Sequence, residues 1–184
     1  EALLPEETSL TDVAAGTAWG RVGDLFEEDG QIDVPGMWQM AGFDRHQYTN
    51  VRYPFPFDPP YVPQENPCGL YEHTFEYEVD QNAPEVFLNF EGVDSCFYVW
   101  LNGAYVGYSQ VSHSTSEFDV TSYVKSGENT MRVLVLKWCD GSYLEDQDKF
   151  RMSGIFRDVY ILKRPECAIR DYRITTSVLK EKTE

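Results

Sequence analysis

The sequence predicts an all-β protein: a jelly-roll β-sandwich with a proline-rich, extended N-terminal segment. From about residue 70 onward, short stretches alternate apolar and polar residues with a period of two, as half-buried strands do. Turn residues separate these stretches, and no long stretch shows helical periodicity. Most of the ten prolines lie within the first 69 residues. Antiparallel strands without crossover helices favour a sandwich.

Residues 70–79, "LYEHTFEYEV", predict the first long strand, with its odd-numbered positions on the buried face and its glutamates on the other. Residues 85–93 predict the second. Residues 96–110 predict two strands joined at Asn102-Gly103, because this dipeptide readily adopts the positive φ angles of a tight hairpin turn.

The later part of the chain predicts further strands with one irregular connection. Residues 116–124 predict a short irregular or one-turn helical link. Residues 130–139 and 156–164 predict two more strands, the former apolar on both faces near its centre. Beyond Pro165, "CAIRDYRITTSV" predicts one more strand, which we assign to the start of a following domain.

Proline dominates the first part of the chain, above all residues 53–63, "YPFPFDPPYVP". Proline fixes φ and donates no backbone hydrogen bond, so this segment is expected to be extended. Its aromatic rings are expected to pack across the sandwich. We therefore divide the chain into an extension (1–30), a jelly-roll domain (31–165) and the start of a further domain or a linker (166–184). The first residue is Glu1 rather than Met, so we expect a piece of a longer polypeptide.

The composition excludes several classes of partner. Fifteen Lys and Arg against 31 Asp and Glu give a net charge of −16, which repels nucleic acid and anionic membrane surfaces. No apolar run is long enough to cross a bilayer. The four cysteines are scattered without zinc-ligand spacing, so we expect reduced thiols in a cytoplasmic protein, with Cys96 in the core. Neutral ligands such as sugars stay open.

Motifs for nucleophilic catalysis and nucleotide binding are missing. The sequence has no GxSxG, no GxGxxG and no P-loop, and its three histidines stand in unrelated contexts. What remains is a wealth of carboxylates and aromatic rings. Trp100 and Trp138 lie in predicted strands and are expected in the core, whereas the position of Trp38 stays open.

Residues 141–158, "GSYLEDQDKFRMSGIFRD", place three carboxylates, Glu145, Asp146 and Asp148, within four positions. A solvated surface loop would show the same pattern. A glycosidase needs two carboxylates on rigid supports that flank the scissile bond, which one short loop does not easily supply. Binding of sugar hydroxyls or of a hard cation fits one such loop better.

Three long stretches make the pattern specific: "VPGMWQMAGFDRHQYTNVRYPFPFDPPYVPQENPCGLYEHTF", "FEGVDSCFYVWLNGAYVGYSQVSHSTSEFDVT" and "GSYLEDQDKFRMSGIFRDVYILKRP". Over residues 31–174 the chain resembles the amino-terminal sugar-binding domain of the glycoside hydrolase family 2 β-galactosidases. The resemblance implies that an immunoglobulin-like domain follows and then a catalytic (β/α)₈ barrel, which carries both catalytic glutamates of this retaining hydrolase. The chain alone is therefore expected to be inactive.

The resemblance also implies site residues and partners. Asn50 and Val51, from "YTN" and its neighbour, would line the galactoside pocket. Asp148 would accept a hydrogen bond from a galactosyl hydroxyl and hold a sodium ion shared with the barrel. Sodium and magnesium are the expected cofactors of the full-length enzyme, with lactose as a substrate and a homo-oligomer as the assembly. An autonomous carbohydrate-binding module and an oligomerisation domain are the alternatives.

The chain departs from the family next to Asp148. Lys149 and Phe150 stand where the family usually has Met and Trp, so the indole N–H is lost. We expect the other charges of the stretch to fix the loop, with Arg151, Arg157 and Asp158 as candidate partners. Glu145 and Asp146 are expected either to bond locally or to be exposed.

Overall fold

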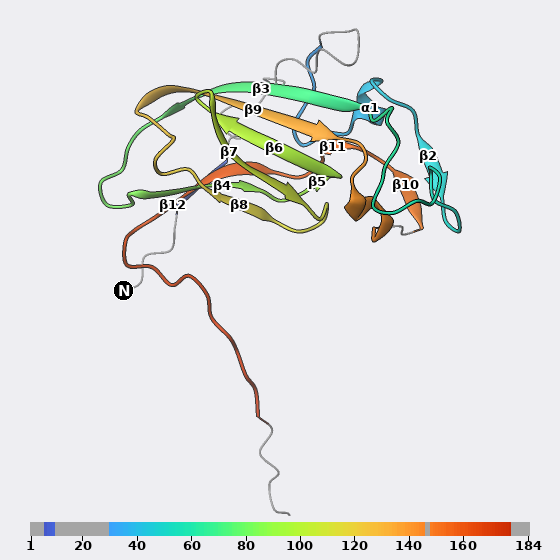
Figure 1. The fold of residues 1–184 in the computed structure, drawn as a ribbon. Coiled ribbons are helices and arrows are strands. Elements are labelled where there is room, and N and C mark those ends of the chain that lie inside the picture. The colour runs from blue at the N-terminus through green and yellow to red at the C-terminus, as the bar shows by residue number, and fades with distance from the viewer. Residues whose placement is uncertain (1–5, 10–29, 146–147, 178–184) are drawn as a thin grey trace, which may run out of the picture.

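The computed structural model describes residues 6–9, 30–145 and 148–177 and is almost entirely β (Figure 1). The strands are β1 (Glu6–Ser9), β2 (Gln47–Thr49), β3 (Cys68–Tyr77), β4 (Glu85–Phe90), β5 (Val93–Asp94), β6 (Cys96–Leu101), β7 (Ala104–Gln110), β8 (Ser116–Asp119), β9 (Gly127–Leu136), β10 (Lys149–Arg151), β11 (Gly154–Ile155) and β12 (Val159–Arg164). The helical elements are a single turn, α1 (Trp38–Ala41), and a 3₁₀ turn, η2 (Asp140–Tyr143).

Two four-stranded antiparallel sheets form the body of the protein. Their strand orders are β3-β9-β6-β7 and β1-β12-β4-β8, and Figure 1 shows them as two layers. The arrangement is a β-sandwich, consistent with the predicted jelly roll. Two smaller ladders pair β2 with β10 and β5 with β11.

The core lies between the inner faces of the two sheets. Alternate residues of each strand point inward, as the period of two predicts. One sheet contributes Tyr71, Phe75, Tyr77, Phe97, Val99, Leu101, Met131, Val133 and Val135, and the other contributes Val86, Leu88, Phe90, Val159 and Ile161. The predicted buried face of the first long strand is confirmed up to Tyr77; Val79 follows the end of the strand and is exposed.

The predicted hairpin is confirmed. Asn102 and Gly103 have φ angles of 53° and 81°, and they join β6 to β7. Two successive residues with positive φ give the type of turn whose twist matches the flanking strands.

The connection predicted at 116–124 is partly wrong. Ser116–Asp119 is the edge strand β8, which pairs with β4. A helical turn follows, in which the Val124 amide donates to the carbonyl of Val120 at 3.0 Å. A four-residue edge strand with polar residues carries too little alternation to be distinguished from a loop.

The tryptophan predictions are also corrected. Trp38 is fully buried, whereas Trp100 and Trp138 are only half-buried. Because β6 turns Phe97, Val99 and Leu101 inward, Trp100 lies on the outer face of its sheet.

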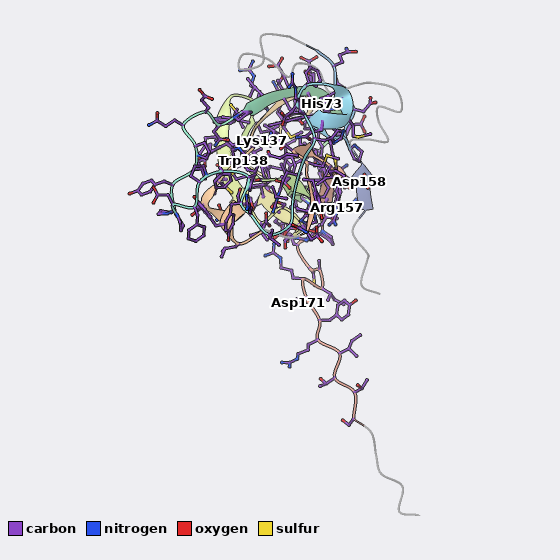
Figure 2. All side chains as sticks on the ribbon, turned by 90° about the vertical axis from the view of Figure 1, so that its right-hand side faces the viewer. His73, Lys137, Trp138, Arg157, Asp158 and Asp171 are labelled. Carbon is purple, nitrogen blue, oxygen red and sulfur yellow. The ribbon has the colours of Figure 1, made fainter. Side chains whose placement is uncertain are left out.

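Residues 165–177 form no strand, contrary to the sequence-based expectation. They run away from the sandwich as an exposed segment, and Asp171 marks its course in Figure 2. A strand needs a neighbour to receive its backbone hydrogen bonds, and these residues have none in the described part of the chain. The assignment of 166–184 to a following domain stays a prediction.

A strand from before residue 31 also belongs to the sandwich. β1 pairs with β12 at the edge of a sheet, although it lies in the stretch that we assigned to an extension. Residues 10–29 lie outside the described part of the chain.

Hydrogen bonds attach the segment from Ile32 to Phe43 to the sandwich. The Gly36 and Trp38 amides donate to the carbonyls of Ile155 and Ser153 at 2.8 and 2.9 Å. The Trp38 indole N–H donates to the hydroxyl of Tyr71 at 2.6 Å. A buried tryptophan with a satisfied N–H is a strong anchor for irregular chain.

The proline-rich residues 53–63 contain no helix or strand. Phe55 is buried there, with its ring 5.0 Å from that of Trp138 and 5.2 Å from that of Tyr143. The Tyr143 hydroxyl donates to the carbonyl of Tyr61 at 2.6 Å. These contacts bring the proline-rich stretch to the start of the acidic loop.

We predict that Trp38→Ala lowers the free energy of unfolding by about 3–5 kcal/mol, because it leaves a cavity and removes the indole donor. Equilibrium unfolding in urea measures the change. Tyr172→Ala, on the exposed 165–177 segment, is the control and should stay within about 0.5 kcal/mol of the wild type. A loss below about 1 kcal/mol for Trp38→Ala would contradict its role as an anchor.

Candidate functional site

The ladder of β2 and β10 brings together two segments that are 100 residues apart in the sequence. The register pairs Gln47 with Arg151, Tyr48 with Phe150 and Thr49 with Lys149. The ladder ends there, and Asn50 and Asp148 are the next residues of the two segments, both within reach of Tyr48. The two polar residues that the family resemblance singled out thus lie side by side at one end of the sandwich, where Figure 1 shows β2 and β10.

The two faces of this ladder differ. Tyr48, Asn50, Asp148 and Phe150 are exposed, while the residues between them turn toward the body of the protein. This alternation follows from the two-residue period of a strand. The exposed face therefore presents a phenol, an amide, a carboxylate and a phenyl ring as one surface.

Asp148 accepts a hydrogen bond through one carboxylate oxygen. The Tyr48 hydroxyl donates to Oδ1 of Asp148 at 2.5 Å, and the Tyr48 ring lies 5.5 Å from the ring of Phe150. The Asp148 carboxylate raises the pKa of Tyr48, because the phenol donates to it and a phenolate would be repelled by it. The Asn50 side chain also interacts with the Tyr48 hydroxyl, and this contact acts on the pKa in the opposite direction. Tyr48 links both predicted site residues.

Glu145 has a different task. Its carboxylate accepts from the backbone N–H of Ser112 at 2.8 Å and from the Ser112 hydroxyl at 2.5 Å. Of the two expectations for Glu145, the structure shows local hydrogen bonding. Asp146 lies outside the described residues. Ser112 thus engages both oxygens of Glu145, so this carboxylate helps to fix the loop.

Arg151 fixes the two halves of the site to each other. It is 7% exposed, and its guanidinium donates to the carbonyl of Glu145 at 2.8 Å and to the hydroxyl of Thr49 at 3.2 Å. Thr49 precedes Asn50, and Glu145 begins the loop that ends at Asp148. Arg151 is thus confirmed as a loop-fixing residue. A rigid guanidinium suits this bridging role because its donors lie in a fixed plane.

The other two candidate partners serve a neighbouring segment. The Arg157 guanidinium donates to the carbonyl of His113 at 3.3 Å and lies 5.4 Å from the Phe156 ring centre. The carbonyl of Asp158 accepts from the amide of Glu91 at 3.0 Å. Figure 2 shows Arg157 and Asp158 side by side.

The surroundings of Asp148 are open and apolar. Val51 is 83% exposed, and Tyr48 and Phe150 are more than half exposed. Asp148 forms no ion pair with another of the described residues, and its side chain is exposed. Exposed aromatic and aliphatic side chains around a few polar groups are typical of a surface that another protein part covers.

The donor set fits a hard cation only in part. Carboxylate and amide oxygens suit sodium, and Asp148 and Asn50 supply one of each. The described residues contain no group of three or more His, Cys, Asp or Glu side chains that could hold a metal ion. They also contain no helix long and apolar enough to cross a membrane.

Comparison with known proteins identifies the family of this chain. Residues 8–165 match the family described as "Glycosyl hydrolases family 2, sugar binding domain". The chain belongs to this family. The curated β-galactosidase of Actinobacillus pleuropneumoniae is 59% identical over 144 residues, which are 78% of this chain and 14% of that protein. The β-galactosidase of Staphylococcus xylosus is 53% identical over 152 residues, 83% of this chain and 15% of that protein.

Among solved structures, a Bacteroides uniformis β-glucuronidase has a TM-score of 0.61 at 18% identity, covering 88% of this chain and 18% of that chain. At this identity the likeness shows the fold alone. The chain spans about one seventh of the length of the two curated β-galactosidases named above, which is the size of one domain.

Tyr48 is the site residue that sequence reasoning missed. It lies in the same "YTN" stretch as Asn50 and two positions before it, so on a strand the two side chains share a face. That signal was available, but only the pairing with β10 shows that Tyr48 reaches Asp148.

We predict that Asp148→Asn lowers the pKa of Tyr48 toward its ordinary value of about 10. The change removes the negative charge that disfavours the phenolate. A titration of the ¹³Cζ signal of the tyrosine-labelled chain measures it, with Tyr48→Phe assigning the signal. Asp119→Asn, on the exposed edge strand β8, should leave the midpoint unchanged. If the titration midpoint of Tyr48 in Asp148→Asn equals that of the wild type, the Tyr48–Asp148 hydrogen bond is absent in solution.

Proposed function

We propose that this chain is the N-terminal, non-catalytic sugar-binding domain of a retaining β-galactosidase, and that it completes the galactoside pocket of a catalytic (β/α)₈ barrel elsewhere in the same polypeptide. The curated relatives named above are β-galactosidases, and the chain corresponds to a small part of each. The galactosidase activity, the barrel and lactose as a substrate belong to this proposal.

The observation that carries the proposal is the pairing of β2 with β10. At the end of this ladder, Asn50 and Asp148 both contact Tyr48, and the exposed side chains of Val51, Tyr48 and Phe150 lie nearby in the chain, which supports the proposal. A carboxylate and an amide side by side can accept and donate hydrogen bonds to sugar hydroxyls, and aromatic rings pack against sugar C–H groups. The open surface supplies one wall of a pocket, so another domain must supply the rest.

Sodium enters the proposal through Asp148. The oxygen of Asp148 that Tyr48 does not use is a suitable ligand for a hard cation, and the remaining ligands would come from the barrel. Magnesium, a homo-oligomeric enzyme and a cytoplasmic location are further parts of the proposal and rest on the family resemblance.

We predict that the isolated 184-residue chain does not hydrolyse o-nitrophenyl β-galactoside. Glu145 helps to fix the loop through Ser112, and a glycosidase needs two carboxylates on rigid supports that flank the scissile bond. A spectrophotometric assay of the purified chain, with the full-length enzyme as the positive control, measures turnover. Turnover that an Asp148→Ala change abolishes would assign catalysis to this chain.

We predict that Asp148→Ala in the full-length enzyme raises KM for galactosides and lowers kcat/KM by at least about 100-fold, as expected for loss of a charged hydrogen-bond acceptor to the substrate. The response of the rate to sodium should also flatten. Steady-state kinetics across sodium concentrations measure both. Asp171→Ala removes an exposed carboxylate on the 165–177 segment and should behave as wild type. Ordinary kinetics and ordinary sodium dependence in Asp148→Ala would remove this residue from the pocket.

A further inference from the structure

The inward face of the β2–β10 ladder holds an ion pair directly behind Asp148. Nζ of Lys149 lies 3.5 Å from Oδ2 of Asp94, and the two side chains are 26% and 15% exposed. Asp94 belongs to β5, which pairs with β11 through the register Asp94–Gly154. The pair therefore ties the small β10 strand to a different ladder of the sandwich.

Asp94 is held firmly on its own side of the pair. The Ser95 hydroxyl donates to its Oδ1 at 2.6 Å and lies 2.7 Å from the carbonyl of Lys137. Burial raises the pKa of Asp94, while Ser95 and Lys149 lower it by stabilising the charged form. A cavity of about 10 Å³ adjoins Asp94, Lys149, Glu145 and Arg151. That volume holds about one water molecule, so the charge of Asp94 depends mainly on Ser95 and Lys149 for stabilisation.

Among the described residues, Lys149 is the anchor nearest to Asp148 along the chain. Glu145 fixes the loop three residues before Asp148, and Arg151 fixes the strand three residues after it. Lys149 is its direct neighbour, and its side chain points to the opposite face of the strand. Holding Lys149 inward fixes the rotation of the backbone about the strand axis, and this rotation sets the direction of the Asp148 carboxylate.

We propose that Asp94 and Lys149 act as one positioning unit that aims the Asp148 carboxylate at its ligand. The role in sugar binding rests on the proposed function, whereas the control of Asp148 orientation does not.

A double-mutant cycle follows from the burial of the pair. Asp94→Asn leaves the ammonium of Lys149 without its partner, and Lys149→Met leaves the Asp94 carboxylate largely desolvated. Removing one member of a largely buried pair is more harmful than removing both, because the remaining charge loses its counter-charge. The double variant Asp94→Asn, Lys149→Met has no uncompensated charge and can keep β10 in place by packing alone.

The first readout is the kinetics of the full-length enzyme with o-nitrophenyl β-galactoside. Each single change should raise KM by about tenfold, the scale expected when a residue that orients a ligand group is lost. The double variant should return to within about threefold of the wild type. Glu72→Gln is the matched control, since it breaks an exposed Glu72–Arg132 ion pair on the outer face of a sheet and should leave KM unchanged.

The second readout does not depend on sugar binding. The ¹³Cζ shift of Tyr48 in the tyrosine-labelled chain, at neutral pH, reports its hydrogen bond to Asp148. Each single change should move this signal toward its position in Asp148→Asn, and the double variant should restore it. Thermal unfolding of each variant checks that the chain is folded.

The outcomes separate the two proposals. A restored Tyr48 signal in the double variant, with KM unmoved in every variant, would keep the positioning unit and refute the role of Asp148 in galactoside binding. A Tyr48 signal and KM that stay at wild-type values in both folded single variants would overturn the positioning unit. Effects of the single changes that add in the double variant would also overturn it, since they would show that the two residues act separately.

Discussion

The pairing of three residues in β2 with three in β10 is the constraint on which the candidate site depends. These strands are short, and neither could persist alone, because a two-stranded ladder gains little stability by itself in water. The surrounding side chains hold them in place. Arg151 donates hydrogen bonds to the Glu145 carbonyl and to Thr49. Glu145 accepts hydrogen bonds from Ser112, and Lys149 forms an ion pair with Asp94. Charged groups thus perform here the structural work that apolar packing performs in the sandwich.

This division explains the crowding of charge in residues 141–158. The sandwich core consists of alternating apolar residues on two sheets, and it could be built without any of these charges. Between Tyr143 and Ile155, the described residues contribute no side chain to this core, so directional bonds define the shape of the loop. Among its described carboxylates, Glu145 serves the loop, while Asp148 projects from it.

Alternation in the sequence was enough to locate the long strands and the Asn102-Gly103 hairpin, because their burial pattern extends over many residues. It could not locate β2 and β10, since three residues show hardly one full period and their pairing spans 100 positions. The burial of Trp38 could not be predicted for a related reason, because its contacts are with Tyr71 and Ser153, which are distant in sequence. Asn50, Val51 and Asp148 came from family resemblance, and local pattern alone would have left Asp148 among several equivalent carboxylates.

The bond between Tyr48 and Asp148 has a thermodynamic consequence for whatever meets this surface. A free aspartate samples several rotamers and loses that freedom when it binds a ligand. Here the phenol has already restricted the carboxylate before any ligand arrives, so the entropic cost falls on folding instead of on association. The second carboxylate oxygen is thereby an acceptor held in a restricted orientation, which can discriminate between stereoisomers that differ only in the orientation of one hydroxyl.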